Sequence, residues 1–152
     1  MKRAPYFAIV LLILIGASPL FGQSNQLMDA MLAQKEASFG ASVYMILAAA
    51  KIIPEDATEE QALVALASRN SRLGSRSASS PITLGEVSHL IMSSLEMKGG
   101  LMYSIIPGPR YASRELSFLK IVTGNTSPWR RVSGEEVVRF LGRALELKEG
   151  NL

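Results

Sequence analysis

Residues 81–97 read PITLGEVSHLIMSSLEM, and this stretch decides the fold class. The Thr83 hydroxyl can accept from the free backbone N–H groups of a helix start, and Glu86, three residues later, can reach back to the backbone of Thr83. The residues that follow place apolar side chains every three or four positions, at Val87, Leu90, Ile91 and Leu95. The stretch therefore predicts a capped amphipathic helix.

The same arrangement occurs twice more in the chain. Thr58 is followed by Gln61, and Ser133 by Glu136, three residues later in each case. Each pair precedes an apolar stripe at helical spacing, made of Ala62, Leu63, Leu66 and Ala67 after the first and of Val137, Leu141, Ala144 and Leu145 after the second. Acidic and apolar positions coincide when residues 83–97 are aligned on residues 133–147, which predicts a helix–loop–helix internal repeat.

Apolar periodicity predicts further helices over about residues 24–38, 43–50 and 112–122. Gly40 permits a break after the first, and Gly124 is placed to end the third in the left-handed conformation. The first of these segments can form a core helix, dock on a partner or lie on a membrane. Period-two alternation is short throughout, so we expect an all-α bundle of five to six short helices.

The N-terminus has the pattern of an export signal. Lys2 and Arg3 precede an apolar run over residues 8–15, and small residues and a proline follow it. Cleavage after Gly22 or Ala17 is expected, with retention as a membrane anchor as the alternative. The chain thus divides into a signal peptide, residues 1–22, and a single helical domain, residues 23–152, outside the cytoplasm, with the bacterial periplasm as the expected compartment.

Composition narrows the function. Of the 16 basic residues, Lys2 and Arg3 belong to the signal, which leaves 14 against 13 acidic residues and weakens any nucleic-acid-binding interpretation. With no cysteine and a single histidine, the usual parts of nucleophilic and metal-assisted hydrolysis are missing. His89 lies off the apolar stripe of its helix and is expected to face solvent. We therefore expect no enzyme, no cofactor and no metal site. A glycan-active enzyme that uses two carboxylates is the less favoured alternative, because the available acids fall at predicted helix starts, where they offset the helix dipole: Glu55, Asp56, Glu59, Glu60, Glu135 and Glu136.

Two polar or turn-rich segments connect the predicted helices. Residues 70–81 are rich in serine and are the best candidate for a hinge. Residues 98–110, in contrast, are apolar as well as turn-rich and are expected to pack over the core.

Aromatic and guanidinium groups concentrate in two short stretches of the chain. They are Tyr103, Arg110, Tyr111 and Arg114 in the first and Trp129, Arg130 and Arg131 in the second. Tyrosine, tryptophan and arginine combine contact area with directed donors, which is typical of binding hot spots. The alternative is that Tyr103 and Trp129 fill the core while the arginines face water.

Residues 82–86, ITLGE, and 132–136, VSGEE, look like two copies of the Ile-Thr-Arg-Ala-Glu motif of the S-layer homology module of bacterial envelope proteins. Residues 111–116, YASREL, with 121–124, IVTG, are similar to the helix that precedes this motif in the family. The resemblance implies a helical envelope module. In the family, the motif arginine contacts an acidic cell-wall polysaccharide, but Leu84 and Gly134 stand in its place here. The family usually groups three modules, whereas this sequence indicates at most two.

These observations predict a non-catalytic module that holds an envelope component. An envelope protein is the first expected partner, because both motif arginines are replaced. The alternative partner is a cell-wall glycan, with Arg110, Arg130 or Arg131 taking the role of the motif arginine. No nucleic acid is expected as a partner, and a membrane only through a retained signal.

Overall fold

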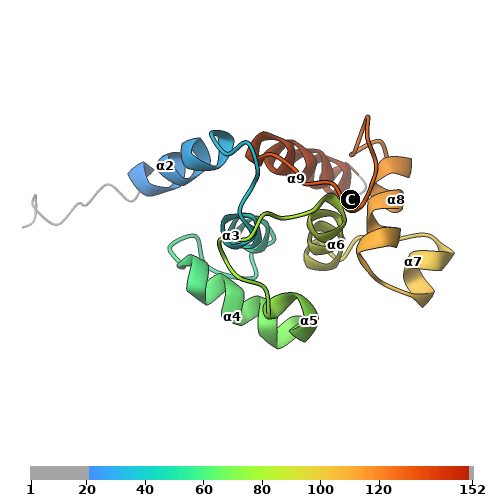
Figure 1. Ribbon diagram of the computed structural model, residues 1–152, viewed down its shortest axis with the longest axis horizontal. Coiled ribbons are helices and arrows are strands. Elements are labelled where there is room, and N and C mark those ends of the chain that lie inside the picture. The colour runs from blue at the N-terminus through green and yellow to red at the C-terminus, as the bar shows by residue number, and fades with distance from the viewer. Residues whose placement is uncertain (1–20, 151–152) are drawn as a thin grey trace, which may run out of the picture.

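The computed structural model describes residues 21–150, so the predicted signal peptide lies almost entirely outside the described residues. Six helices have ten or more residues: α2 (Phe21–Leu32), α3 (Phe39–Ala49), α4 (Glu59–Arg69), α6 (Leu84–Ser94), α8 (Pro109–Phe118) and α9 (Gly134–Glu149). Two single turns, α5 (Ser71–Gly74) and α7 (Leu101–Ile105), lie in the connections (Figure 1). Within residues 21–150 there is no strand, only two isolated bridges, so the all-α prediction is confirmed.

The three predicted capping boxes are present. The side chains of Thr58, Thr83 and Ser133 accept from the backbone N–H three residues later, and the side chain at that position accepts from the cap backbone. These contacts satisfy N–H groups that a helix start leaves without an intrahelical partner. Local sequence therefore determines where α4, α6 and α9 begin.

A ring of backbone hydrogen bonds brings the starts of α3, α6 and α9 together. The N–H of Ala37 donates to the carbonyl of Val132 at 2.8 Å, that of Val132 to Ile82 at 3.3 Å, and that of Ile82 to Ala37 at 2.9 Å. All three residues are buried. Because each lies two residues before the first residue of its helix, the three helices diverge from a common point and enclose the core between them.

Helix α6 lies at the centre of the molecule, in contact with α3, α8 and α9. Every residue from Leu84 to Met92 is buried, not only the apolar stripe. The expectation that His89 faces solvent is therefore wrong: 8% of its surface is exposed. A helix surrounded on several sides buries its polar positions as well, which periodicity on one helix does not predict.

Two predicted helix boundaries are wrong. α2 ends at Leu32, and an irregular stretch over residues 33–38 precedes α3, so the break comes before Gly40 and not at it. α8 ends at Phe118, and the left-handed residue that follows is Lys120, with φ 57°, while Gly124 lies in the next loop. The N–H of Ile121 donates to the carbonyl of Leu116 at 2.9 Å, and burial of Ile121 stabilises this turn without a glycine.

The serine-rich segment over residues 70–81 carries α5 and is attached to α6. Arg76 donates to a carboxylate oxygen of Glu86 at 2.6 Å and to the carbonyl of Pro81 at 3.0 Å. Its guanidinium also lies 5.6 Å from the centre of the Phe39 ring. The hinge remains a prediction, and these contacts are what such a motion would have to break.

Candidate functional site

Two of the predicted binding segments meet at one groove of about 510 Å³. The groove is lined by Arg110, Ser113, Arg114, Thr126, Ser127, Pro128 and Trp129. Arg110 and Arg114 lie one turn apart on α8, and the other wall is the loop between α8 and α9. The groove therefore joins segments that the sequence separates by about a dozen residues.

The start of α6 holds the loop in place against α8. The N–H of Leu84 donates to the carbonyl of Arg130 at 2.8 Å, and the N–H of Gly85 donates to the carbonyl of Pro128 at 2.8 Å. A Cβ on Gly85 would lie 3.0 Å from both Pro109 Cβ and the Pro128 carbonyl, so a larger residue there would push the two walls apart. The Ile-Thr-x-Gly-Glu segment is thus part of the support of the groove.

The groove carries positive charge that is not neutralised by the ion pairs found among residues 21–150. Arg110 and Arg114 are exposed, and neither takes part in one of those pairs. Trp129 is 76% exposed, so it does not fill the core. Two guanidinium groups and an accessible indole, with the Thr126 hydroxyl beside them, suit an anionic ligand that also offers a flat face.

The structure gives Arg130 a structural role. Its Nη2 and Nη1 donate to the Glu136 carboxylate at 2.8 and 3.0 Å, and its Nε donates to the carbonyl of Asn125 at 2.7 Å. Burial of Glu136 raises the pKa of its carboxyl, but hydrogen bonds from Arg130 and the Ser133 backbone, with the charges of Arg130 and Arg139, outweigh it and lower the pKa overall. Arg130 therefore supports the cap of α9.

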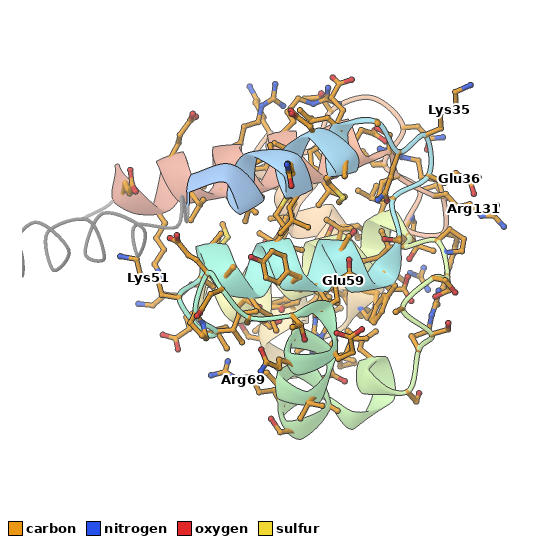
Figure 2. All side chains as sticks on the ribbon, turned by 90° about the vertical axis from the view of Figure 1, so that its left-hand side faces the viewer. Lys35, Glu36, Lys51, Glu59, Arg69 and Arg131 are labelled. Carbon is orange, nitrogen blue, oxygen red and sulfur yellow. The ribbon has the colours of Figure 1, made fainter. Side chains whose placement is uncertain are left out.

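Arg131, Tyr103 and Tyr111 also lie outside the lining of the groove. Arg131 donates to both carboxylate oxygens of Glu36 at 2.9 Å, and Figure 2 shows the two side chains together at the edge of the molecule. Tyr103 is buried, as the core-filling alternative predicted for it, and Tyr111 is half-buried against the core. Of the seven predicted residues, the groove thus unites Arg110, Arg114 and Trp129.

His89 forms a buried polar cluster with Asn70 and Tyr103. The Asn70 amide nitrogen lies 3.3 Å from His89 Nε2, and the Tyr103 hydroxyl lies 3.3 Å from His89 Nδ1. Burial lowers the pKa of His89 and raises that of Tyr103. Because Asn70 Oδ1 accepts from the N–H of Leu73, the amide presents its nitrogen to His89 Nε2, and this arrangement favours the neutral imidazole with its proton on Nδ1. The cluster ties α5 and α7 to α6.

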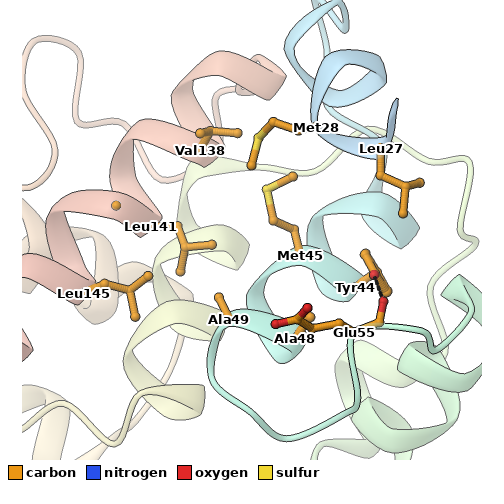
Figure 3. Close-up of a pocket in the computed structure, with 11 residues that line it drawn as sticks. Leu27, Met28, Tyr44, Met45, Ala48, Ala49, Glu55, Val138, Leu141 and Leu145 are labelled. Atoms are coloured by element: carbon orange, nitrogen blue, oxygen red, sulfur yellow. Dashed lines mark hydrogen bonds between the residues drawn. The ribbon is translucent and has the colours of Figure 1, made fainter. Parts of the chain in front are cut away.

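An apolar groove that the sequence did not predict opens between α2, α3 and α9 (Figure 3). Its volume is about 330 Å³, and its lining includes Leu27, Met28, Met45, Ala49, Leu141, Gly142 and Leu145. Met31 of α2 is buried, whereas Leu27 and Met28 remain about 40% exposed at this groove. α2 is thus a core helix that also leaves part of its apolar face exposed. Its packing against α9 decides which of its apolar residues are buried and which stay exposed.

Other classes of site find no support among residues 21–150. In this part of the chain, no group of three or more histidine and acidic side chains is placed to hold a metal ion. No helix there combines the length and apolar character needed to cross a membrane. Comparison with protein-family models, with curated proteins and with solved structures finds no match to this chain.

Proposed function

We propose that this chain is a non-catalytic module of the bacterial cell envelope, exported from the cytoplasm, that holds an acidic cell-wall polymer in the groove between α8 and residues 126–129. The observation that carries the proposal is the pair Arg110 and Arg114 beside the exposed Trp129. Neither arginine has an ion-pair partner among those found in residues 21–150. The positive charge of these two arginines is therefore available to bind an anion.

The chemistry of the groove favours a glycan over a purely ionic ligand. A guanidinium presents a planar fork of donors that matches a carboxylate or phosphate. An indole face packs against the apolar face of a sugar ring, and hydroxyl groups beside it can exchange hydrogen bonds with the ring substituents. An acidic polysaccharide offers both features in one repeating unit, so it fits Arg110, Arg114 and Trp129 together.

The arrangement of the helix starts supports the proposed relationship to the S-layer homology module. The hydrogen-bonded ring places Ala37-Ser38, Ile82-Thr83 and Val132-Ser133 at equivalent positions before α3, α6 and α9. We infer three helix–loop–helix units, one more than the sequence indicated, with α2, α4 and α8 as their first helices. The first copy lacks the motif acid, because Ala41 stands there, and Ser38 forms no side-chain cap, so no capping box marks this helix start in the sequence. This explains why the sequence pattern shows two copies.

An envelope protein is the second candidate partner for the same groove. Tryptophan and arginine are enriched at the energetic centre of protein interfaces, and the groove is lined by the exposed Trp129 together with Arg110 and Arg114. An acidic segment of a protein would meet the same charges as a polymer. Both candidates would bind through the same residues of the groove. A pull-down from the cell envelope distinguishes them, because it would recover cell-wall polymer in one case and a protein in the other.

The test is a pull-down with purified sacculi over a series of salt concentrations. Binding should weaken as salt rises, because the charges at the groove are exposed to solvent. Arg110→Ala and Trp129→Ala should each reduce binding, whereas Arg131→Ala should leave it unchanged, because Arg131 pairs with Glu36 away from the groove. Binding that all three variants retain would refute the proposed groove, and crosslinked recovery of one protein without sacculi would favour the protein partner.

A further inference from the structure

The amide of Asn70 forms two contacts, one with its oxygen and one with its nitrogen. Oδ1 accepts from the N–H of Leu73 at 3.2 Å and so caps α5, the single turn that follows α4. The amide nitrogen lies 3.3 Å from Nε2 of His89 on α6. Asn70 therefore joins the start of α5 to the side of α6, and it does so only while Nε2 accepts a hydrogen bond.

The other nitrogen of the imidazole also has a partner. His89 Nδ1 lies 3.3 Å from the hydroxyl of Tyr103, the buried residue of α7. With its proton on Nδ1, the neutral ring donates to this hydroxyl and accepts from Asn70, so both nitrogens are satisfied at a buried position. The neutral imidazole thus fits its surroundings in the folded protein.

Tyr103 is also the residue that attaches α7 to the core. The prediction that residues 98–110 pack over the core is wrong for the large apolar side chains around Tyr103, which are exposed: Leu101, Met102, Ile105 and Ile106. Because these side chains do not pack on the core, α7 is attached through Tyr103 and its contact with His89.

The titratable and charged groups around the imidazole come from three helices. Tyr103 lies on α7, and Arg69, at the end of α4, lines a hollow of about 290 Å³ together with His89. Glu86 lies one turn earlier on α6 and pairs with Arg76. Burial alone lowers the pKa of His89, so no carboxylate among residues 21–150, including those on α3, α8 and α9, holds the ring in its charged form.

A second proton on the ring reverses the role of Nε2, which becomes a donor. It then faces the donor groups of the Asn70 amide nitrogen at a buried site. The amide can turn over and present its oxygen to the charged ring, but the N–H of Leu73 then loses its acceptor. A charged imidazole and a capped α5 therefore exclude each other.

We propose that the His89–Asn70 pair is an acid-sensitive latch, which holds α5 against α6 when the imidazole is neutral and releases α5 when the imidazole takes up a proton. The release extends along the chain, because the N–H of Arg76 donates to the carbonyl of Leu73 at 3.1 Å. Acid thus loosens the serine-rich connection, residues 70–81, at its first turn. The latch gives the hinge predicted for this segment a chemical trigger.

The test is amide hydrogen exchange of the Leu73 N–H, measured by NMR on the whole chain between about pH 5 and 7.5. The exchange rate, divided by that of an unprotected amide, gives the equilibrium constant for opening at this position. Because the open form takes up a proton that the closed form resists, the opening constant should rise as pH falls below about 6.5, the ordinary pKa of histidine. The rise should reach up to about tenfold per pH unit, as linkage requires for a single proton. Opening should exceed global unfolding, measured with urea at the same pH, because only α5 is released.

Two variants test whether the pair is responsible. His89→Gln has no titratable group at this position, so its opening constant at Leu73 should not change between about pH 7.5 and about pH 5.5. Asn70→Asp supplies one carboxylate oxygen to the Leu73 N–H and the other to Nε2, and a carboxylate beside the ring favours its charged form. In this variant the opening constant should fall instead of rise on acidification, and NMR titration should place the pKa of His89 above about 6.5.

Each measurement can overturn the proposal. It is wrong if the opening constant of the wild-type protein does not rise at acid pH, or if this constant equals that for global unfolding. It is also wrong if His89→Gln keeps the acid response, or if Asn70→Asp responds in the same direction as the wild-type protein. Should His89→Gln fail to fold, the direction of the change in Asn70→Asp decides alone.

Discussion

Replacement of His89 by glutamine should abolish most of the pH dependence of stability in the range just below about pH 6.5, the ordinary pKa of histidine, because His89 is the single histidine of the chain. The imidazole is 8% exposed and stands between the Asn70 amide nitrogen and the Tyr103 hydroxyl. A proton added to Nε2 would face the Asn70 N–H groups, and Asn70 could turn its oxygen to the ring only by releasing the N–H of Leu73.

The sign and size of this pH effect on the free energy of unfolding follow from the linkage between proton binding and folding. Burial lowers the pKa of His89 in the folded protein below the ordinary value of 6.5. Between these two values the unfolded chain binds more protons, so the free energy of unfolding falls as pH falls through this window, by up to about 1.4 kcal/mol per pH unit. The loss begins near the unfolded pKa and levels off below the folded one. Above that window the imidazole is neutral in both states and contributes no slope.

Urea unfolding at a series of pH values from about 5 to 7.5 measures this effect in both proteins. At neutral pH, His89→Gln should have a free energy of unfolding about 1–3 kcal/mol lower than the wild-type protein, because the buried hydrogen bonds at this position change. As pH falls, the free energy of unfolding of this variant should stay nearly constant. The contribution of carboxyl groups is common to both proteins and cancels in the difference. Equal slopes in the two proteins, or an imidazole that titrates by NMR at or above its ordinary pKa, would refute the reasoning.

Three further predictions concern the helix starts and the groove. Gly134→Ala should lower the free energy of unfolding by roughly 1–3 kcal/mol, because a Cβ there would clash with the carbonyl oxygen of Met31. Gly142→Ala, where a Cβ meets no atom within 4 Å, should raise the free energy of unfolding by about 1 kcal/mol, and urea unfolding that finds Gly134→Ala more stable than Gly142→Ala would contradict both expectations. Thr83→Ala should cost about 0.5–2 kcal/mol through loss of the α6 cap, and an unchanged Tm would show that the cap contributes nothing. Trp129→Ala should leave Tm unchanged while binding to sacculi falls; a lowered Tm would show that the indole supports the fold.

Local interactions explain why much of the fold could be predicted. A capping box depends on residues three apart, so Thr58, Thr83 and Ser133 identified the starts of α4, α6 and α9 without any tertiary information. The same holds for the all-α class, which follows from apolar periodicity. The concentration of arginine and aromatic residues likewise pointed to Arg110, Arg114 and Trp129, because their chemistry is visible in the residue types.

The sequence by itself thus determined the helical class, three helix starts and the residue types of the candidate groove. Only the tertiary structure decided which polar residues are buried and which apolar residues stay exposed. His89 is buried because α6 has neighbours on several sides, and the large apolar side chains of α7 and the residue after it are exposed because the turn packs on the core through Tyr103. The exposed residues are Leu101, Met102, Ile105 and Ile106. Likewise, Arg130 and Arg131 differ from Arg110 because Glu136 and Glu36 come within reach of the first two. Apart from the Arg130–Glu136 pair, whose partners are six residues apart, these outcomes depend on contacts between different helices and loops, which the periodicity of a single helix does not record.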